Sequence, residues 1–342
     1  MTRTQALGST DVIVPPLGFG AAAIGNLYRQ VSDEEARGTV AAALRVGLTY
    51  VDTAPHYGFG LSESRLGTVL EQMDPAEEVV ISSKVGRLLK PVESASGERH
   101  SFVDAAPFEP VFDYSYDAVM RSWEESRRRL RRDRIDILYA HDLGCVIHGD
   151  DHQHHFSTFL QGGYRAMREL RDSGTVRAIG IGANEWQVCD DAMQEGEFDV
   201  FLLAGRYTLL EQTALDSFLP ECARRNVSVV IGGPYNSGIL AAGTRSGRPL
   251  FYDYEPAPPA IVDRVRKLEE IAERFGIPLA AAALQFPLCH PQVASVIPGQ
   301  ASVAEVEETV RLFETKIPHD FWSELKSAGL LHPDAPTAEA NL

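Results

Sequence analysis

Short apolar runs alternate with amphipathic segments along most of the chain. Each run is apolar at nearly every position, which is typical of strands that are buried on both faces of a parallel sheet. These runs predict eight strands, at residues 17–20, 48–52, 79–84, 135–141, 176–182, 200–203, 227–231 and 294–297.

The segments between the strands show the spacing of helices with one apolar face. The first of them begins with Ser32 and Glu35, placed as in a capping box, and ends at Gly47. Further helices are predicted at 62–73, 116–130, 163–172, 213–225, 260–275 and 303–313. Strands and helices in this alternation predict an α/β fold, a closed (β/α)8 TIM barrel, with an open doubly wound sheet as the alternative.

No change of composition divides the 342 residues, so we expect a single barrel domain over residues 1–330. Residues 331–342 contain prolines and no apolar pattern, which predicts a flexible C-terminal tail. Three long connections follow strand ends, at 85–115, 142–162 and 232–259. Loops in this position usually build the substrate site of a barrel.

The charge balance narrows the range of partners. The chain has 32 Lys and Arg against 48 Asp and Glu, a formal net charge of −16. A general attraction to nucleic acid or to an anionic membrane is therefore not expected, and a small-molecule substrate is. Four scattered cysteines without a C-x-x-C pair, and the lack of a leader or an apolar span, predict a soluble cytoplasmic protein.

Polar residues at strand ends are the candidates for chemistry. Asp52, Lys84 and His141 each end a predicted strand, and Tyr57 follows Asp52 in the next turn. A tyrosine, with an ordinary pKa of about 10, needs a neighbouring cation to act near neutral pH. Lys84 would lower the pKa of Tyr57, Asp52 would keep Lys84 charged, and His141 would hydrogen-bond the substrate oxygen.

Less specific interpretations apply to several of these residues. Asp52 and Lys84 alone would be interpreted as a structural ion pair. Four polar residues, each at a strand end or in the turn that follows one, favour an active site. His56 is expected to be a wall of the pocket or a turn residue rather than a catalyst. His148, His152, His154 and His155 are expected to lie in a loop and to bind no metal. The arginines between 127 and 134 are expected to form the solvent-exposed face of a helix.

Three stretches carry a resemblance to a known family. They read Gly47-Leu-Thr-Tyr-Val-Asp52-Thr-Ala-Pro-His-Tyr57-Gly58, Ile81-Ser-Ser-Lys84 and Asp136-Ile-Leu-Tyr-Ala-His141-Asp142. The chain resembles the aldo-keto reductase superfamily over residues 5–314. This resemblance implies Asp52, Tyr57, Lys84 and His141 as the catalytic residues, with Tyr57 as the general acid and base.

The resemblance also implies a nicotinamide cofactor held by the last two strands and their loops. Residues 231–240 are similar to the family's pyrophosphate loop, residues 297–309 to its adenosine segment, and Asn184 to its amide-contacting asparagine. The residues expected to bind the cofactor are Gly20, Asn184, Tyr207, Gly232, Pro234, Asn236, Ser237, Gly238, Leu240, Pro298, Gly299, Gln300, Glu305, Glu308 and Thr309.

Two departures from the family pattern concern this cofactor. Gly232 stands where many members place a tyrosine that stacks on the nicotinamide, so such stacking must come from elsewhere or be absent. Gly299 and Glu305 stand where NADP-preferring members carry Lys and Arg. A carboxylate repels a 2′-phosphate and can accept a hydrogen bond from a ribose hydroxyl, which predicts NAD over NADP.

Within the superfamily, the motifs resemble a branch of aldose 1-dehydrogenases and pyridoxal 4-dehydrogenases. The resemblance implies oxidation of a cyclic hemiacetal to a lactone. The preferred substrate is an aldose such as L-fucose or D-arabinose, and pyridoxal is the alternative. The loops offer apolar walls and polar partners for either: Phe102, Phe108, Phe112 and Tyr114, beside Glu109, Asp113, His148 and His155. A cofactor-binding regulatory subunit with little turnover is the alternative of another class, and the oligomeric state stays open.

Overall fold

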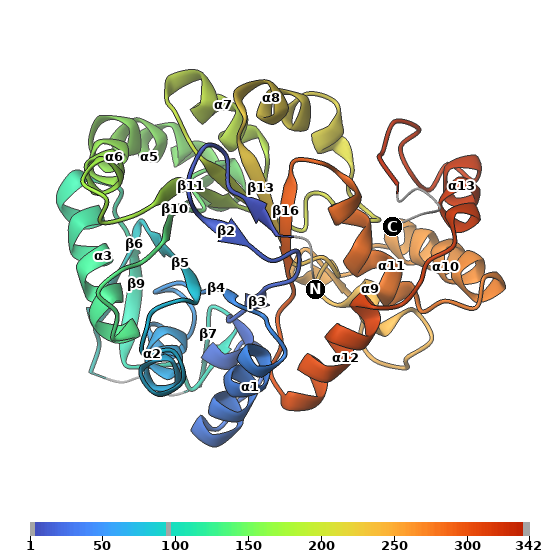
Figure 1. Cartoon of the computed structure of the whole chain (residues 1–342), viewed down its shortest axis with the longest axis horizontal. Coiled ribbons are helices and arrows are strands. Elements are labelled where there is room, and N and C mark those ends of the chain that lie inside the picture. Colours follow the sequence, from blue (N-terminus) through green and yellow to red (C-terminus); the bar gives the residue numbers. More distant parts are fainter. Residues whose placement is uncertain (1–3, 94–96, 338–342) are drawn as a thin grey trace.

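The computed structural model of the chain describes residues 4–93 and 97–337 (Figure 1). Eight parallel strands form one sheet in the order β16, β13, β12, β11, β10, β5, β4, β3. Their bounds are β3 (Phe19–Gly20), β4 (Tyr50–Asp52), β5 (Val80–Val85), β10 (Ile137–His141), β11 (Ala178–Ala183), β12 (Val200–Ala204), β13 (Ser228–Gly232) and β16 (Val293–Ile297).

The first and last strands of this sheet also meet. The Gly18 N–H donates to the Val296 carbonyl at 2.9 Å, and the Gly20 N–H donates to the Pro298 carbonyl at 3.0 Å. The sheet therefore closes into a barrel, and the predicted (β/α)8 fold is confirmed. All eight predicted strands are present, with ends shifted by no more than a few residues.

Helices surround the barrel (Figure 1). They include α1 (Asp33–Arg45), α2 (Leu61–Met73), α3 (Tyr116–Leu130), α6 (Tyr164–Asp172), α7 (Gln187–Glu195), α8 (Phe218–Arg225), α10 (Pro259–Arg274), α11 (Leu279–Gln285), α12 (Val303–Phe313) and α13 (His319–Ser327). The predicted capping box is present, because Ser32 and Glu35 each accept the backbone N–H of the other.

The prediction was incomplete for four of these helices. It joined the 3-10 turn Thr213–Leu215 to α8 as one helix, and it omitted α7, α11 and α13. In α11, nearly every side chain is Ala or Leu and five are buried. A helix of this composition has no polar face, so the amphipathic spacing that marks the other helices is missing.

The N-terminal hairpin closes one end of the barrel. Strands β1 (Gln5–Ala6) and β2 (Ile13–Val14) pair antiparallel. Leu7, Val12 and Val14 are fully buried and pack with barrel residues such as Tyr50 and Val230. This end of the barrel is filled with side chains, so a ligand can enter the barrel only from the other end.

The three long connections lie after strands β5, β10 and β13. The first contains the antiparallel pairs β6 (Arg87–Pro91) with β9 (Phe108–Phe112), and β7 (Glu98–Arg99) with β8 (Phe102–Val103). The second, expected as a loop, is largely helical, with α4 (Cys145–His148) and α5 (His152–Thr158). The third contains α9 (Ile239–Ala242) and the hairpin of β14 (Phe251–Tyr252) with β15 (Glu255–Pro256).

Several residues just after the expected boundary at residue 330 make contacts with the rest of the chain. Leu331 and Ala335 are buried, and the His332 N–H donates to the Gln212 side chain at 2.7 Å. The start of the expected tail is thus packed against the barrel, and residues 338–342 lie outside the described residues.

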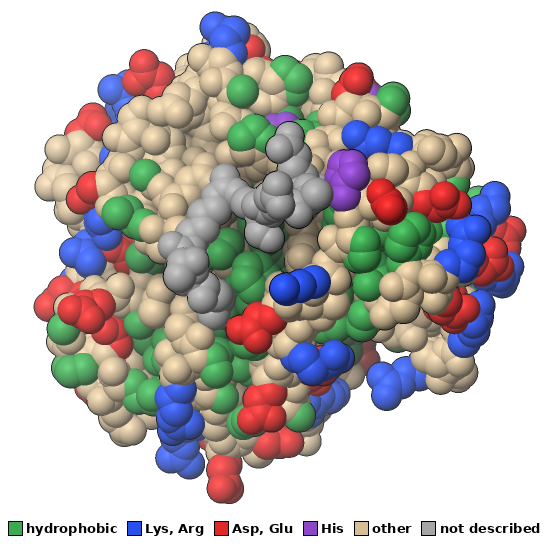
Figure 2. All heavy atoms as spheres, turned by 45° about the vertical axis from the view of Figure 1, so that its right-hand side comes forward, with side chains coloured by type: hydrophobic (Ala, Val, Ile, Leu, Met, Phe, Trp, Pro, Cys, Tyr) green, Lys and Arg blue, Asp and Glu red, His purple; other side chains and the backbone are tan. Residues whose placement is uncertain are grey.

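Two further findings concern the surface. On the face shown in Figure 2, acidic and basic side chains are interspersed. Among the described residues, no helix combines the length and the apolarity that a membrane crossing requires.

Candidate active site

The four predicted catalytic residues meet at the open end of the barrel. Asp52 ends β4, Lys84 lies in β5, and His141 ends β10. The Lys84 ammonium donates to Asp52 Oδ2 at 2.7 Å, to the Thr53 carbonyl at 2.9 Å and to the Tyr57 hydroxyl oxygen at 3.1 Å. An ammonium has three donors, and all three are used. Lys84 therefore has a full set of hydrogen-bond partners although only 2% of it is exposed.

Tyr57 accepts from Lys84, so its own hydroxyl hydrogen is available to a group in the cavity. The pKa of Tyr57 is raised well above 10, mainly by burial and further by the carboxylates of Asp52 and Asp142. The net pKa of Tyr57 in the protein without ligands is therefore raised, because the loss of hydration outweighs the nearby cation of Arg87, and the lowering expected from Lys84 stays a prediction. Tyr57 is a neutral phenol that can hold a proton.

His141 lies next to Tyr57, with the two rings 6.0 Å apart and nearly perpendicular. Burial, together with the charges of Arg87 and Lys84, holds the pKa of His141 well below its usual 6.5. The imidazole is thus neutral at physiological pH and can both donate and accept a hydrogen bond.

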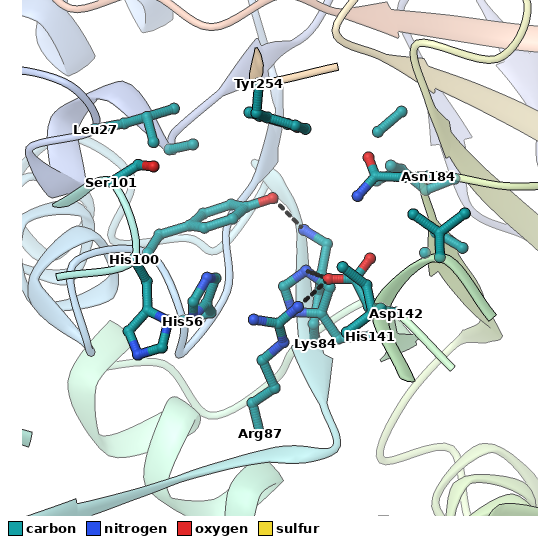
Figure 3. A pocket seen from close by; sticks show the side chains of 18 of the residues that line it. Leu27, His56, Lys84, Arg87, His100, Ser101, His141, Asp142, Asn184 and Tyr254 are labelled. Atoms are coloured by element: carbon teal, nitrogen blue, oxygen red, sulfur yellow. Dashed lines mark hydrogen bonds and ion pairs between the residues drawn. The ribbon is translucent and has the colours of Figure 1, made fainter. Parts of the chain in front are cut away.

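A cavity of about 470 Å³ opens above these residues (Figure 3). Its wall includes His56, as expected, and Phe102. Most of the other loop residues proposed for the substrate lie elsewhere: Tyr114 is buried and its hydroxyl donates to the His141 carbonyl at 2.7 Å, and the Phe112 ring lies beneath Arg87.

Two charged residues on the cavity wall were not predicted. Arg87 begins β6, three residues after Lys84, and Asp142 directly follows His141. They form a buried ion pair with each other. Burial raises the pKa of Asp142, and the nearby Arg87 and Lys84 oppose this effect. Their positions just past strand ends are a signal that could have identified both.

Tyr254 was also missed. It lies at the tip of the β14–β15 hairpin, above the cavity (Figure 3), and is 56% exposed. Its N–H donates to the Ser237 hydroxyl at 3.0 Å, and Arg206 binds the adjacent Asp253 through both carboxylate oxygens, at 2.7 and 3.0 Å. No local pattern reveals this placement, because it depends on how the loop folds back.

A second cleft, of about 560 Å³, adjoins the cavity and shares Tyr57, Asn184 and Tyr254 with it. Many of the expected cofactor residues line this cleft: Gly20, Asn184, Gly232, Pro234, Asn236, Ser237, Gly238, Gly299 and Glu305. The segments after β13 and β16, which are far apart in sequence, are thus brought to one cleft. Its position beside Tyr57 allows a bound group to reach the cavity.

The loop after β13 presents its backbone to this cleft. Gly233, Asn236, Ser237 and Gly238 all have positive φ, from 45° to 91°. Within the described part of the chain, the Tyr235 and Ser237 N–H groups donate to no acceptor. Unpaired N–H groups in a concave, left-handed turn are suited to an anion such as a pyrophosphate.

Other expected cofactor residues do not line the cleft. Tyr207 is fully buried and packs against Phe286, with ring centroids 5.2 Å apart. Glu308 points to solvent and pairs with Arg311. The remaining expected residues are buried and are not among those that line the cleft: Leu240, Pro298, Gln300 and Thr309. The place of a residue in a motif does not determine the direction in which its side chain points.

The histidines of residues 148–155 contact aromatic side chains, whereas the arginines of residues 127–134 pair with carboxylates. The His148 and His155 rings lie 4.0 Å apart, and His148 contacts the Tyr114 hydroxyl. Among the residues that the structure describes, no three His, Cys, Asp or Glu side chains are arranged to hold a metal. In the arginine run, Arg129 pairs with Glu63 and Arg132 pairs with Asp74, so the run is largely neutralised by carboxylates.

Comparisons with known proteins agree with this geometry. The model of the Aldo/keto reductase family matches residues 16–329. The chain is 43% identical to a pyridoxal 4-dehydrogenase of Microbacterium luteolum over 96% of this chain and 98% of the relative. It is 38% identical to a D-threo-aldose 1-dehydrogenase of a Pseudomonas species, over 97% and 99%.

A solved structure shows the same fold. The holo form of an aldo-keto reductase from Bacillus halodurans superimposes with a TM-score of 0.74 and 24% sequence identity, covering 98% of each chain.

Proposed function

The chain belongs to the Aldo/keto reductase family, and from this premise we propose that it is an NAD-dependent dehydrogenase of cyclic hemiacetals. Its substrate is an aldose such as L-fucose or D-arabinose, which it oxidises at C1 to the lactone. One observation carries the proposal: Lys84 binds Asp52 and Tyr57 together at the point where the cavity and the cleft meet.

The residues present fit a nicotinamide dinucleotide in the cleft. The unpaired Tyr235 and Ser237 N–H groups would hold the pyrophosphate, and Asn184 would contact the nicotinamide amide. Glu305 lines the adenosine end, where its Oε2 accepts the Ala301 N–H at 2.7 Å. A carboxylate fixed there supports NAD over NADP, because it repels a 2′-phosphate.

When bound, NAD supplies the hydride acceptor. In oxidation, the C1 hydroxyl loses its proton to the Tyr57 oxygen while the C1 hydrogen leaves as hydride, so the carbon becomes a lactone carbonyl. Lys84 stabilises the Tyr57 phenolate that takes this proton, and Asp52 holds Lys84 in place. His141 donates or accepts a hydrogen bond at the substrate oxygen and keeps it near Tyr57.

A second substrate is favoured by specific observations. Phe102 and Tyr254 give the cavity aromatic walls suited to a pyridine ring, and one relative is a pyridoxal 4-dehydrogenase. The aldose is supported by the charged groups of the wall, Arg87 and Asp142, and by the relative named D-threo-aldose 1-dehydrogenase.

We place the reaction in the cytoplasm, where free thiols such as Cys145, Cys189 and Cys222 persist.

The test is NADH formation by the purified protein with NAD and, in parallel, L-fucose, D-arabinose or pyridoxal at equal concentration. The proposal predicts NADH from the two aldoses. A rate on pyridoxal alone would replace the aldose with the second candidate. If NAD binds and none of the three is oxidised, the protein is a cofactor-binding regulatory subunit and the proposed activity is contradicted.

A further inference from the structure

Arg87 and Asp142 form an ion pair on the cavity wall that is separate from the Lys84 and Asp52 pair. Arg87 is 8% exposed and Asp142 is 6% exposed, and both line the cavity. In Figure 3, the Arg87 guanidinium lies between His56 and Asp142 and is joined to Asp142. The two residues come from different loops, one after β5 and one after β10.

A purely structural role leaves much of this pair unexplained. A guanidinium has five N–H donors. In the described part of the chain, Arg87 donates to Asp142 through Nη2, and its buried Nε has no acceptor. Burying charges is costly unless their hydrogen-bonding groups are satisfied. Arg87 lines the cavity, so a ligand there can use the Nη donors that Asp142 leaves free, whereas the buried Nε is out of its reach.

The backbone at Asp142 is also unusual. Its φ is +52°, in the left-handed region that residues with a side chain seldom adopt. The Asp142 N–H donates to the Gly182 carbonyl at 2.8 Å, which fixes this conformation. On the other side, the Phe112 ring lies 4.7 Å from the Arg87 guanidinium carbon and supports it. Both charged groups are thus held in place beside the cavity.

The pair lies next to the reacting centre. Asp142 Oδ2 is 3.4 Å from His141 Nε2, and His141 faces Tyr57. A substrate oxygen held by Tyr57 and His141 therefore brings the substituent on the neighbouring carbon to Asp142. An ionised carboxylate only accepts hydrogen bonds and a guanidinium only donates them. Because the Asp142 carboxylate and the Arg87 guanidinium lie side by side, they can bind two adjacent hydroxyls. One hydroxyl donates to the carboxylate, and the other accepts from the guanidinium.

We propose that Arg87 and Asp142 determine substrate specificity by binding two adjacent hydroxyls next to the hemiacetal carbon. Asp142 accepts from the C2 hydroxyl of an aldose, and Arg87 donates to the neighbouring hydroxyl. This proposal rests on the proposed function and deepens it, because it selects an aldose over pyridoxal. The phenolate of pyridoxal can accept from Arg87 but is repelled by Asp142.

The test compares D-arabinose with 2-deoxy-D-ribose, which is the same pentose without the C2 hydroxyl. A lost hydrogen bond to a charged group is worth about 1.5–3 kcal/mol, which corresponds to about 10- to 150-fold in kcat/KM. Wild-type protein should therefore prefer D-arabinose by at least about tenfold. In Asp142→Asn, kcat/KM should fall more for D-arabinose than for 2-deoxy-D-ribose, so the preference collapses.

A matched control is Asp74→Asn. Asp74 forms a similarly buried ion pair with Arg132, away from both the cavity and the cleft. This variant should lose stability and keep the wild-type preference between the two sugars. Arg87→Lys keeps the charge but loses the paired N–H donors of the guanidinium, and it should lower kcat/KM for both sugars, because both carry the hydroxyl that Arg87 binds.

Two results would overturn the inference. The first is that wild-type protein oxidises both sugars with equal kcat/KM. The second is that Asp142→Asn lowers kcat/KM for both sugars by the same factor. The wild-type comparison alone decides the question if Asp142→Asn does not fold. Absence of NADH with every hemiacetal would instead contradict the proposed function, so the two failures are distinguishable.

Discussion

The cavity and the adjoining cleft differ in what lines them. In the cavity, buried charges are paired with one another, Lys84 with Asp52 and Arg87 with Asp142. In the cleft, the loop after β13 offers glycines and unpaired backbone N–H groups. Removing one side chain from the cavity leaves a buried charge without its partner, whereas the cleft depends on backbone conformation. Substitutions in the two regions should therefore have different consequences.

The largest effect is expected at the cavity, in Tyr57→Phe. The ring remains but the hydroxyl that exchanges the proton is lost, so kcat should fall by about 10²- to 10⁴-fold. The Kd for NAD, measured by titration calorimetry, should stay close to that of wild type. Tyr116→Phe, on the outer helix α3, is the control and should retain wild-type kcat. A Tyr57→Phe enzyme with near-normal kcat would refute the acid-base role.

Asp52→Ala should reduce stability by about 3–5 kcal/mol, because it leaves the Lys84 ammonium buried without its carboxylate. Urea unfolding measures this free energy. Asp263→Ala removes an exposed carboxylate paired with Arg266 at 2.6 Å and should cost less than about 1 kcal/mol. Equal losses in the two variants would show that the burial of the Lys84 pair has no special importance.

The pH dependence of oxidation should reflect Tyr57. Since burial holds the pKa of Tyr57 well above 10, the phenolate that accepts the proton becomes more populated as pH rises. Below that pKa, kcat/KM should increase by about tenfold per pH unit. The pKa of His141 is far below 6.5, so no step from His141 is expected between neutral and mildly acidic pH. A flat profile up to alkaline pH would contradict this assignment.

At the cleft, Gly238→Ala should weaken NAD binding by about tenfold, or about 1.4 kcal/mol. Gly238 has a φ of +91° and open space around it, so the added methyl group acts only through the backbone of the cradle. Gly174→Ala is matched, with a φ of +75° and equally open surroundings, but it follows α6 on the outside of the barrel. Both variants should lose similar stability, and only Gly238→Ala should change the Kd for NAD.

The smallest effect is expected at Glu305. In Glu305→Gln the repulsion of a 2′-phosphate is removed, so NADP should bind about fivefold more tightly, which corresponds to about 1 kcal/mol. The Gln oxygen can still accept the Ala301 N–H. Glu307→Gln, two residues further along α12 and outside the cleft, should leave NADP affinity unchanged. Tighter binding of NADP than NAD by wild-type protein would contradict the cofactor preference.

The sequence was most informative where one physical constraint acts locally. Strands buried on both faces must be apolar throughout, so all eight were predicted, and charged residues at their ends stood out as candidates. The all-apolar α11 lacks the polar face that identifies a helix, so it was missed. The composition of residues 142–162 resembled a loop, although short helices form there.

Other properties depend on three-dimensional packing. The burial that raises the pKa of Tyr57 cannot be predicted from residue types alone. Tyr254 reaches the cavity only because the β14–β15 hairpin folds back and is tied to Ser237. Tyr207 lies in a segment that was expected to bind the cofactor, but its ring turns into the core against Phe286.

The most direct test of the central claim follows the transferred hydrogen. The enzyme would be supplied with NAD and D-arabinose deuterated at C1, and the reduced nicotinamide would be analysed by mass spectrometry. Hydride transfer from C1 in the Tyr57 cavity predicts that deuterium appears in the reduced cofactor and that the other product is the lactone. Reduced cofactor without deuterium, or an arabinose left unoxidised while NAD is bound, would contradict it.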